Sequence, residues 1–351
     1  MTYRFIPNAP AWSGLSPEKP DFEQCWGELC DFLCKELSIN GKLYKKKSDY
    51  NGIGGHYIFK MEKGDSIFLK VVSRNTVSRQ IAAEQIASYL ASRGLWVNHV
   101  LSGWPRYFHD HVVFAYPYIK GRFYNATLED IATVGKKLRK LHDALQQFPQ
   151  RDEIAHLSSK RERFLQVWHQ ELLDNINEFE GFKGNGYSES LREIISSTAP
   201  VFHPSTYLQP IHGDLNSGNI MFTADGGDVV ILDFEDATHS FISPEFDLAM
   251  AIERMIIVPI LDDEIAYRFA ETLLTSYQAC SPVEFSMTVC LRDILKKFQV
   301  RAICILGHMQ LQGIETSMEE WKKFFFLYDL IEKRSDLIHK IESLFKKQIA
   351  T

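Results

Sequence analysis

The hydrophobic pattern of this chain changes its period, and that change limits the folds it can adopt. In the front part, short runs rich in β-branched and aromatic residues, such as His56–Met61 and Ser66–Val72, are typical of strands. After Thr127 apolar residues recur at helical spacing, and only Pro210–Phe234 returns to strand-like runs. The sequence therefore predicts an α+β protein with a small β-rich front part and a large, mainly helical back part.

Local signals place the elements of the front part. Apolar residues at helical spacing after an N-cap aspartate predict a leading helix over Asp21–Leu37. A second helix is expected from Ser78 to Arg93, because Gly94 follows it as a C-terminal stop. The aromatic segment Phe114–Gly121 then connects the two parts, so we expect one domain over residues 1–117 and another over 118–351.

Composition excludes several classes of partner. The 351 residues are 45% hydrophobic and 24% charged, as in globular proteins, and the net charge of −6 disfavours binding to a nucleic-acid backbone. No apolar run is long enough for a membrane span, and Met1–Trp12 lacks the sections of a signal peptide. We therefore expect a cytoplasmic protein with no membrane partner.

Three oxygen-bearing side chains mark the candidate site. The nearly continuous apolar run Val229–Leu232 ends on Asp233, and a carboxylate at the end of a buried strand would be costly without a purpose. Asp214 and Asn219 lie on the loop that opens the preceding strand, so all three should reach the same edge. Carboxylate and amide oxygens are magnesium ligands, and phosphoryl transfer needs such a set beside the transferring group.

Around these residues the sequence resembles a known family. The segments HGDLNSGNI (His212–Ile220), ILDFEDA (Ile231–Ala237) and PEFDLA (Pro244–Ala249) are similar to those of the aminoglycoside phosphotransferase and choline kinase superfamily. The resemblance implies a two-lobed fold similar to that of protein kinases, with an N-terminal lobe that binds a nucleotide. It also implies Mg²⁺, with ATP or GTP as co-substrate, and a small molecule with a hydroxyl group as acceptor.

The same resemblance assigns roles to residues of these segments. Asp214 looks like the catalytic base, or the residue that orients the acceptor hydroxyl, while Asn219 and Asp233 look like magnesium ligands. Asp247 looks like the helix aspartate that braces the catalytic loop. His212 is expected to support that loop by hydrogen bonding rather than to act as an acid or base.

Residues of the front part are candidates for holding the nucleotide. Lys70 lies in the middle of a strand, where an ammonium needs a counter-charge, and Glu84 on the next helix is its expected partner. In the family such a lysine binds the α and β phosphates, although a lysine that reaches solvent would fit the same pattern. Backbone amides of a glycine segment could approach the phosphates, or the segment could be a plain turn: Gly52, Gly54 and Gly55.

Two further groups of residues each have two possible roles. The segment around Pro117 resembles the linker between lobes whose main chain hydrogen-bonds adenine, and these bonds would fall on Tyr116 and Tyr118, because proline has no N–H. A strand end with two half-buried aromatics fits equally. Asp236 is a candidate for supporting the metal or a cationic substrate, whereas Glu235 could do the same or be solvated.

The acceptor is constrained by the short connection between Asp233 and Asp247, which leaves no room for the peptide platform of a protein kinase. We expect an aminoglycoside, an amino alcohol, a homoserine-like amino acid or a sugar. An amine-bearing acceptor would be favoured if acidic residues line its pocket: Glu235, Asp236, Glu253, Asp262 and Asp263. The alternatives are a Ser/Thr protein kinase and a pseudokinase that binds nucleotide or a partner without turnover.

Overall fold

The computed structural model describes residues 22–25, 27–47, 53–179, 187–202, 207–224, 228–279 and 290–347. They form two compact units. The sheet unit contains the described residues up to Tyr124 together with Gly218–Thr238, and the helical unit contains Asn125–Ser217 and the residues from His239 onward. The mixed α+β content agrees with the sequence prediction.

The sheet unit is built on a six-stranded antiparallel sheet with the order β1-β2-β3-β4-β6-β5. Two helices accompany it, α1 (Glu28–Leu37) and α2 (Val77–Ser92). The two strands expected at His56–Met61 and Ser66–Val72 and the second helix are all present. The strands are β1 (Phe22–Cys25), β2 (Gly41–Lys46), β3 (Gly55–Met61), β4 (Ile67–Ser73), β5 (Arg106–Phe108) and β6 (His111–Pro117).

The start of this unit differs from the predicted leading helix over Asp21–Leu37. Phe22–Cys25 forms β1, and only Glu28–Leu37 is helical, while Asp21 lies outside the described residues. The reason is tertiary, because β1 pairs along its whole length with β2, from Phe22 opposite Lys46 to Cys25 opposite Leu43. Backbone pairing with a neighbouring strand outweighs helical spacing in so short a segment.

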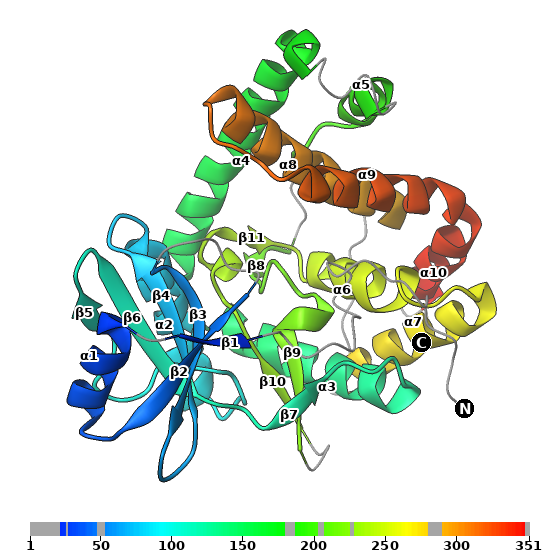
Figure 1. Cartoon of the computed structure of the whole chain (residues 1–351). Helices are drawn as coiled ribbons and strands as arrows, with labels where there is room; N and C mark the ends of the chain where they lie inside the picture. The colour runs from blue at the N-terminus through cyan, green and yellow to red at the C-terminus, as the bar shows by residue number, and fades with distance from the viewer. Residues whose placement is uncertain are drawn as a thin grey trace. The chain divides into compact units, whose positions relative to one another are not determined.

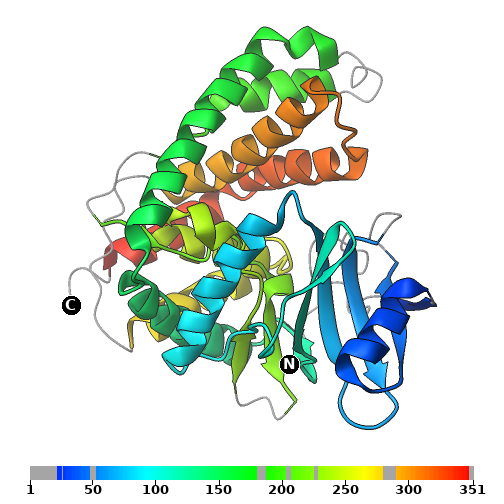
Figure 2. The same cartoon turned by 90° about the vertical axis from the view of Figure 1, so that its left-hand side faces the viewer.

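Alternation along β4 decides which way Lys70 points. Leu69 and Val71 belong to the apolar cluster that contains Leu33 of α1, whereas Phe68 and Val72 pack with Val77 at the start of α2. Because side chains of a strand alternate between faces, Lys70 lies on the same face as Phe68, toward α2. Figure 2 shows α1 and α2 on opposite sides of this sheet.

A second, three-stranded sheet completes the sheet unit, in the order β10-β9-β7. It joins β7 (Gly121–Phe123), β9 (Ile220–Thr223) and β10 (Val229–Ile231). Because β7 pairs with β9, the segment after residue 117 and the later hairpin belong with the front part of the chain. The observed division therefore differs from the single boundary at residue 117. Asp225, Gly226 and Gly227 between β9 and β10 are a strong turn signal in the sequence, and they lie outside the described residues.

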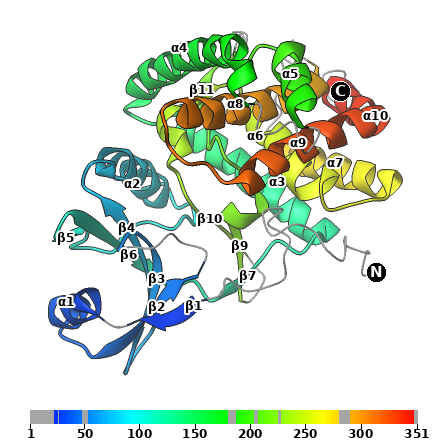
Figure 3. The same cartoon turned by 45° about the horizontal axis from the view of Figure 1, so that its top comes forward.

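The helical unit contains the predicted amphipathic helices. Its apolar core includes Leu165 and Leu172 of α4, Val300 and Ile303 of α8 and Trp321 of α9, and Figures 1 and 3 show these three helices together. The helices are α3 (Leu128–Gln146), α4 (Arg151–Asp174), α5 (Tyr187–Ser197), α6 (Glu245–Ala251), α7 (Asp263–Gln278), α8 (Leu291–Leu311), α9 (Met318–Lys333) and α10 (Ser335–Lys347).

This unit also contains a π-helical turn and a two-stranded sheet, and its last long helical segment is divided in two. A π-helical turn, η5 (Ile252–Ile257), follows α6, and a two-stranded sheet joins β8 (Gln209–Pro210) to β11 (Phe241–Ile242). The apolar spacing over Met318–Phe345 predicts continuous helix, but the structure divides it at Arg334. The guanidinium of Arg334 donates to the carbonyl oxygens of Ile257 and Ile260, at and just beyond the end of the π-helical turn. Among the residues described, no helix is long and apolar enough to cross a membrane.

Replacing Gly135 by alanine tests the close packing of α3 on α7. A Cβ at Gly135 would lie 2.5 Å from the backbone oxygen of Leu273. Overpacking costs about 1–3 kcal/mol, more than the roughly 1 kcal/mol that alanine adds to helix propensity. We expect Gly135→Ala to lower the free energy of unfolding measured with urea. Exposed Lys136→Ala is the control, and equal stability of the two variants would contradict the close approach.

Candidate active site

A buried carboxylate holds the backbone of the loop that carries Asp214. Asp247, on α6 and 1% exposed, accepts hydrogen bonds from the amides of His212 (2.8 Å) and Gly213 (2.9 Å). His142 of α3 lies 3.0 Å from the same carboxylate through Nε2. These contacts have the geometry that the expected bracing role requires, and they satisfy amides that would otherwise be buried without partners.

The surroundings of Asp247 keep it ionised. Burial alone would raise the pKa of this carboxyl. The hydrogen bonds from His142 and from the amide of Gly213 outweigh burial, so the pKa lies below its ordinary value. His142 is itself oriented by Tyr277, whose hydroxyl lies 2.8 Å from Nδ1. The result is a fixed acceptor beneath the loop.

The loop presents Asp214 from a rigid backbone. The amide of Asp214 donates to Nδ1 of His212 at 3.3 Å, and His212 is completely buried. Gly213 has a φ of 83°, a conformation that favours glycine. Buried Leu215 follows Asp214, which is half-buried. His212 therefore contacts the loop backbone as the sequence predicted for a supporting residue, while the chemical role of Asp214 stays a prediction.

In the sheet unit, backbone pairing brings together the two predicted metal ligands. Asn219 ends the short 3-10 helix η3 (Ser217–Asn219), and its carbonyl accepts a hydrogen bond of 2.9 Å from the amide of Leu232. Asp233 follows directly, with a φ of 58° that turns the chain away from β10. This left-handed conformation is tolerated by aspartate better than by most residues. The amide and carboxylate oxygens of Asn219 and Asp233 are hard donors and fit Mg²⁺.

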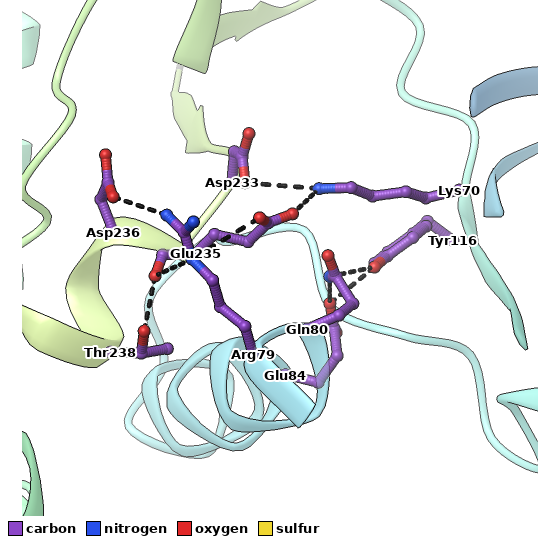
Figure 4. A network of polar contacts seen from close by, with 9 residues as sticks. All are labelled: Lys70, Arg79, Gln80, Glu84, Tyr116, Asp233, Glu235, Asp236 and Thr238. Carbon is purple, nitrogen blue, oxygen red and sulfur yellow. Dashed lines mark hydrogen bonds and ion pairs between the residues drawn. The ribbon is translucent and has the colours of Figure 1, made fainter. Parts of the chain in front are cut away.

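Lys70 lies in a network of carboxylates that the sequence assigned differently (Figure 4). Its ammonium forms an ion pair with Glu235 and lies 3.6 Å from Asp233. The expected partner, Glu84, is not among its partners. The correction has a physical reason, because Glu84 is already occupied by neutral donors and because the turn after β10 delivers two other carboxylates to the lysine.

Glu84 joins three segments of the sheet unit. It accepts hydrogen bonds from the hydroxyl of Tyr116 (2.6 Å), the side chain of Gln80 (2.7 Å) and the amide of Val100 (3.1 Å). Burial raises the pKa of Glu84, and these hydrogen bonds and the charge of Lys70 oppose that change. Burial and the neighbouring Glu84 also raise the pKa of Tyr116 far above its ordinary value, so its hydroxyl remains a donor.

Arg79 attaches α2 to the segment after Asp233. Its Nη2 donates to Asp236 at 2.6 Å, and its Nε donates to the carbonyl of Glu235 at 3.3 Å. The hydroxyl of Thr238 donates to the same carbonyl at 2.7 Å. Glu235 is therefore held by backbone contacts rather than freely solvated. Arg79 and Gln80 were not among the residues predicted from the sequence, although the spacing of Gln80 and Glu84 by one helical turn is a detectable signal.

The remaining nucleotide candidates are placed separately. Gly52 lies outside the described residues, while Gly54 precedes β3 and Gly55 begins it with a φ of 133°. Tyr116 lies near the end of β6 with its ring buried, and Tyr118 beyond the strand is 41% exposed. The contacts expected for their backbone groups stay predictions.

The acidic residues expected to favour an amine each have an intramolecular partner. Glu235 pairs with Lys70, and Asp236 with Arg79. Glu253 lies 2.9 Å from the guanidinium of Arg254, and Asp263 lies 2.6 Å from that of Arg334. Asp262 accepts the amide of Ile265 at the start of α7. Less negative charge is therefore available to a cationic acceptor than the sequence alone indicates.

Comparison with known proteins places these features in a family. A sequence model of the phosphotransferase enzyme family matches residues 56–283. No curated protein matches the chain. Among solved structures, an amicoumacin kinase in complex with AMP-PNP, Ca²⁺ and amicoumacin is 16% identical, with a TM-score of 0.55 over 87% of this chain and 93% of that one.

Two further solved structures are similar at the same level. A spectinomycin phosphotransferase bound to AMP is 13% identical, with a TM-score of 0.56 over 89% of this chain and 96% of its own. An ethanolamine kinase from Plasmodium vivax is 14% identical, with a TM-score of 0.51 over 88% of this chain and 80% of its own. At this identity the likeness shows the fold, which is the kinase-like α+β fold that the sequence predicted.

Replacing Asp247 by asparagine tests the bracing of the loop. An amide oxygen can accept one of the two backbone N–H groups but presents an NH₂ group to the other. A buried N–H left without an acceptor costs about 1–3 kcal/mol, and loss of the charge adds to this. We expect Asp247→Asn to lower the free energy of unfolding by about 2–4 kcal/mol. Urea unfolding measures this, and an unchanged value would contradict the bracing contacts.

Glu253 gives the helical unit a defined pH dependence. Burial raises the pKa of Glu253 from 4.5 to about 6, and the charges of Arg254 and Lys323 oppose this effect. Because the folded state binds this proton more tightly than the unfolded state, the contribution of Glu253 to stability falls as the pH rises through this window. Relative to Glu253→Gln, we expect the wild type to lose about 2 kcal/mol between about pH 3.5 and pH 7.5 in urea unfolding, with the steepest loss between the two pKa values. Parallel curves for the two proteins would contradict the raised pKa.

Proposed function

Because the chain belongs to the phosphotransferase enzyme family, we propose that it is a small-molecule kinase that transfers the γ-phosphate of ATP or GTP to a hydroxyl group. The observation that supports this most directly is the gathering of Lys70, Asn219 and Asp233 in the sheet unit. The ammonium of Lys70 lies 3.6 Å from the carboxylate of Asp233. The carbonyl of Asn219 accepts a hydrogen bond from the amide of Leu232, the residue just before Asp233. A phosphate-binding cation and two metal ligands are the groups that phosphoryl transfer needs in one place.

The proposal gives each part of this machinery a task. Asn219 and Asp233 would hold Mg²⁺, which neutralises charge on the phosphate oxygens when it is bound. Lys70 would contact the α and β phosphates, and the amides of Gly54 and Gly55 would approach them. The main chain at Tyr116 and Tyr118 would bind adenine. The family match and the kinase-like neighbours support these assignments.

Asp214 would receive or orient the proton of the acceptor hydroxyl. Its backbone is fixed through His212, and the loop backbone is held by Asp247. A loop with a fixed backbone supports this role, because phosphoryl transfer depends mainly on orientation. The intact set also disfavours the pseudokinase alternative, which predicts nucleotide binding without turnover.

We propose a small molecule as acceptor. Between Asp233 and Asp247 the structure has only the 3-10 helix η4 (Asp236–His239) and the two-residue strand β11, so it contains no platform for a peptide. This disfavours a Ser/Thr protein kinase. The solved neighbours named above are kinases of amicoumacin, spectinomycin and ethanolamine, which supports aminoglycosides, amino alcohols, homoserine-like amino acids and sugars as the acceptors to test. Use of ATP or GTP is in keeping with a cytoplasmic enzyme.

Turnover with a panel of these acceptors tests the proposed function. With Mg²⁺ and either ATP or GTP, we expect a rise in melting temperature and nucleotide consumption that depends on one acceptor class. Asp214→Ala should lower kcat by about 100-fold or more while nucleotide binding persists. The control is Asp152→Ala, at an exposed position of α4. Nucleotide binding without turnover of any acceptor would favour the pseudokinase, and no binding of either nucleotide would contradict both.

A further inference from the structure

The position of Lys70 raises the question of which residue orients it. Its side chain is only 16% exposed, on the sheet face that lies toward α2. A partly buried ammonium needs a carboxylate partner to hold it in one orientation. The described residues offer Glu84 on α2, which the sequence favours, and Glu235 on the turn after β10. Figure 4 shows Asp233 and Glu235 at the ammonium of Lys70, whereas Glu84 contacts Gln80 and Tyr116.

Glu84 is committed to neutral partners. One oxygen accepts from Tyr116 and Gln80, and the other accepts from the amide of Val100. These hydrogen bonds tie α2 to β6 and to the segment before β5. A carboxylate with this set of donors is a structural link within the sheet unit, and moving it toward Lys70 would leave a buried tyrosine hydroxyl and a backbone amide without their acceptor.

Glu235 differs from Glu84, because its backbone is fixed and its carboxylate faces two cations. One carboxylate oxygen pairs with Lys70, and the other lies 3.8 Å from Nε of Arg79. The carbonyl of Glu235 accepts from Arg79 at 3.3 Å and from Thr238 at 2.7 Å. Arg79 is in turn held by Asp236 at 2.6 Å. These contacts fix the turn to α2, so the carboxylate of Glu235 reaches Lys70 from a defined position. Asp233, two residues earlier, lies 3.6 Å from the same ammonium.

We propose that Glu235 is the residue that positions Lys70 for the nucleotide phosphates, in the place that the sequence gives to Glu84. The inference rests on the proposed function, since it concerns the orientation of a phosphate-binding lysine. In this proposal, the turn that begins at Asp233 supplies a metal ligand, Asp233, and also the carboxylate of Glu235 that orients the phosphate-binding ammonium of Lys70. Arg79 supports this arrangement by holding the turn to α2, so α2 acts on Lys70 through Glu235.

A double-mutant cycle on nucleotide affinity tests this proposal. The dissociation constant of a fluorescent ATP analogue is measured for the wild type, Lys70→Met, Glu235→Gln and the double variant, with Mg²⁺ and with EDTA. Loss of a charge-assisted contact corresponds to about 10- to 100-fold weaker binding. We expect Glu235→Gln to weaken binding by about 10-fold and the double variant to bind no more weakly than Lys70→Met alone.

Two control variants separate positioning from folding. Glu84→Gln should lower the melting temperature. Because Glu84 does not contact the lysine, the fold-changes in dissociation constant caused by Glu84→Gln and Lys70→Met should multiply in the double variant. Glu23→Gln, at an exposed position of β1, should change neither quantity. If Glu235→Gln does not fold, Glu235→Asp keeps the charge but shortens the side chain, and it should show the same non-multiplicative loss.

Several results would overturn the inference. Multiplicative effects of Lys70→Met and Glu235→Gln would show that Glu235 acts independently of the lysine. If the effects of the two variants multiply in the presence of Mg²⁺ but not in EDTA, Glu235 is a metal ligand instead. These outcomes leave the proposed function intact, because the wild type still binds nucleotide. A wild type that binds no nucleotide under either condition would remove the proposed function and this inference together.

Discussion

The buried carboxylate of Asp247 is the constraint on which the candidate catalytic loop depends. It accepts the amides of His212 and Gly213, and His142 and Tyr277 hold it in place from the neighbouring helices α3 and α7. A loop buried at its base must satisfy its amides internally, because water cannot reach them. The position of Asp214 therefore follows from helix packing in the helical unit, although Asp214 itself belongs to a loop.

In the sheet unit, one lysine and several carboxylates lie close together, and each carboxylate needs a hydrogen-bond donor or a cation as its partner. Glu84 is supplied with neutral donors, while Glu235 and Asp233 face Lys70. Glu84 therefore has a structural role, whereas Glu235 and the predicted metal ligand Asp233 carry the charge that faces Lys70. Glu235 and Asp236 are likewise paired with cations of the same unit, Lys70 and Arg79.

Sequence reasoning succeeded where a signal is long or chemically specific. The helices after Thr127, the hairpin of β3 and β4, and the motif residues of the β9–β10 region all have such signals. It failed for Phe22–Cys25, β2 and β7, which are short and are fixed by pairing with distant strands. It also failed to divide the last long helix, because the break depends on contacts of Arg334 with backbone oxygens far away in the sequence.

The sequence by itself determined the chemistry available to this protein: a family motif with Asp214, Asn219 and Asp233, a lysine within a strand, and a loop-bracing aspartate at Asp247. These are properties of residue types and local spacing. Only the tertiary structure decided which carboxylate meets Lys70, because Glu235 lies 165 residues away along the chain. A choice between Glu84 and Glu235 depends on which donors each one meets after folding. Of the donors to Glu84, only Gln80 is local in sequence, whereas Tyr116 and Val100 meet it through the tertiary fold.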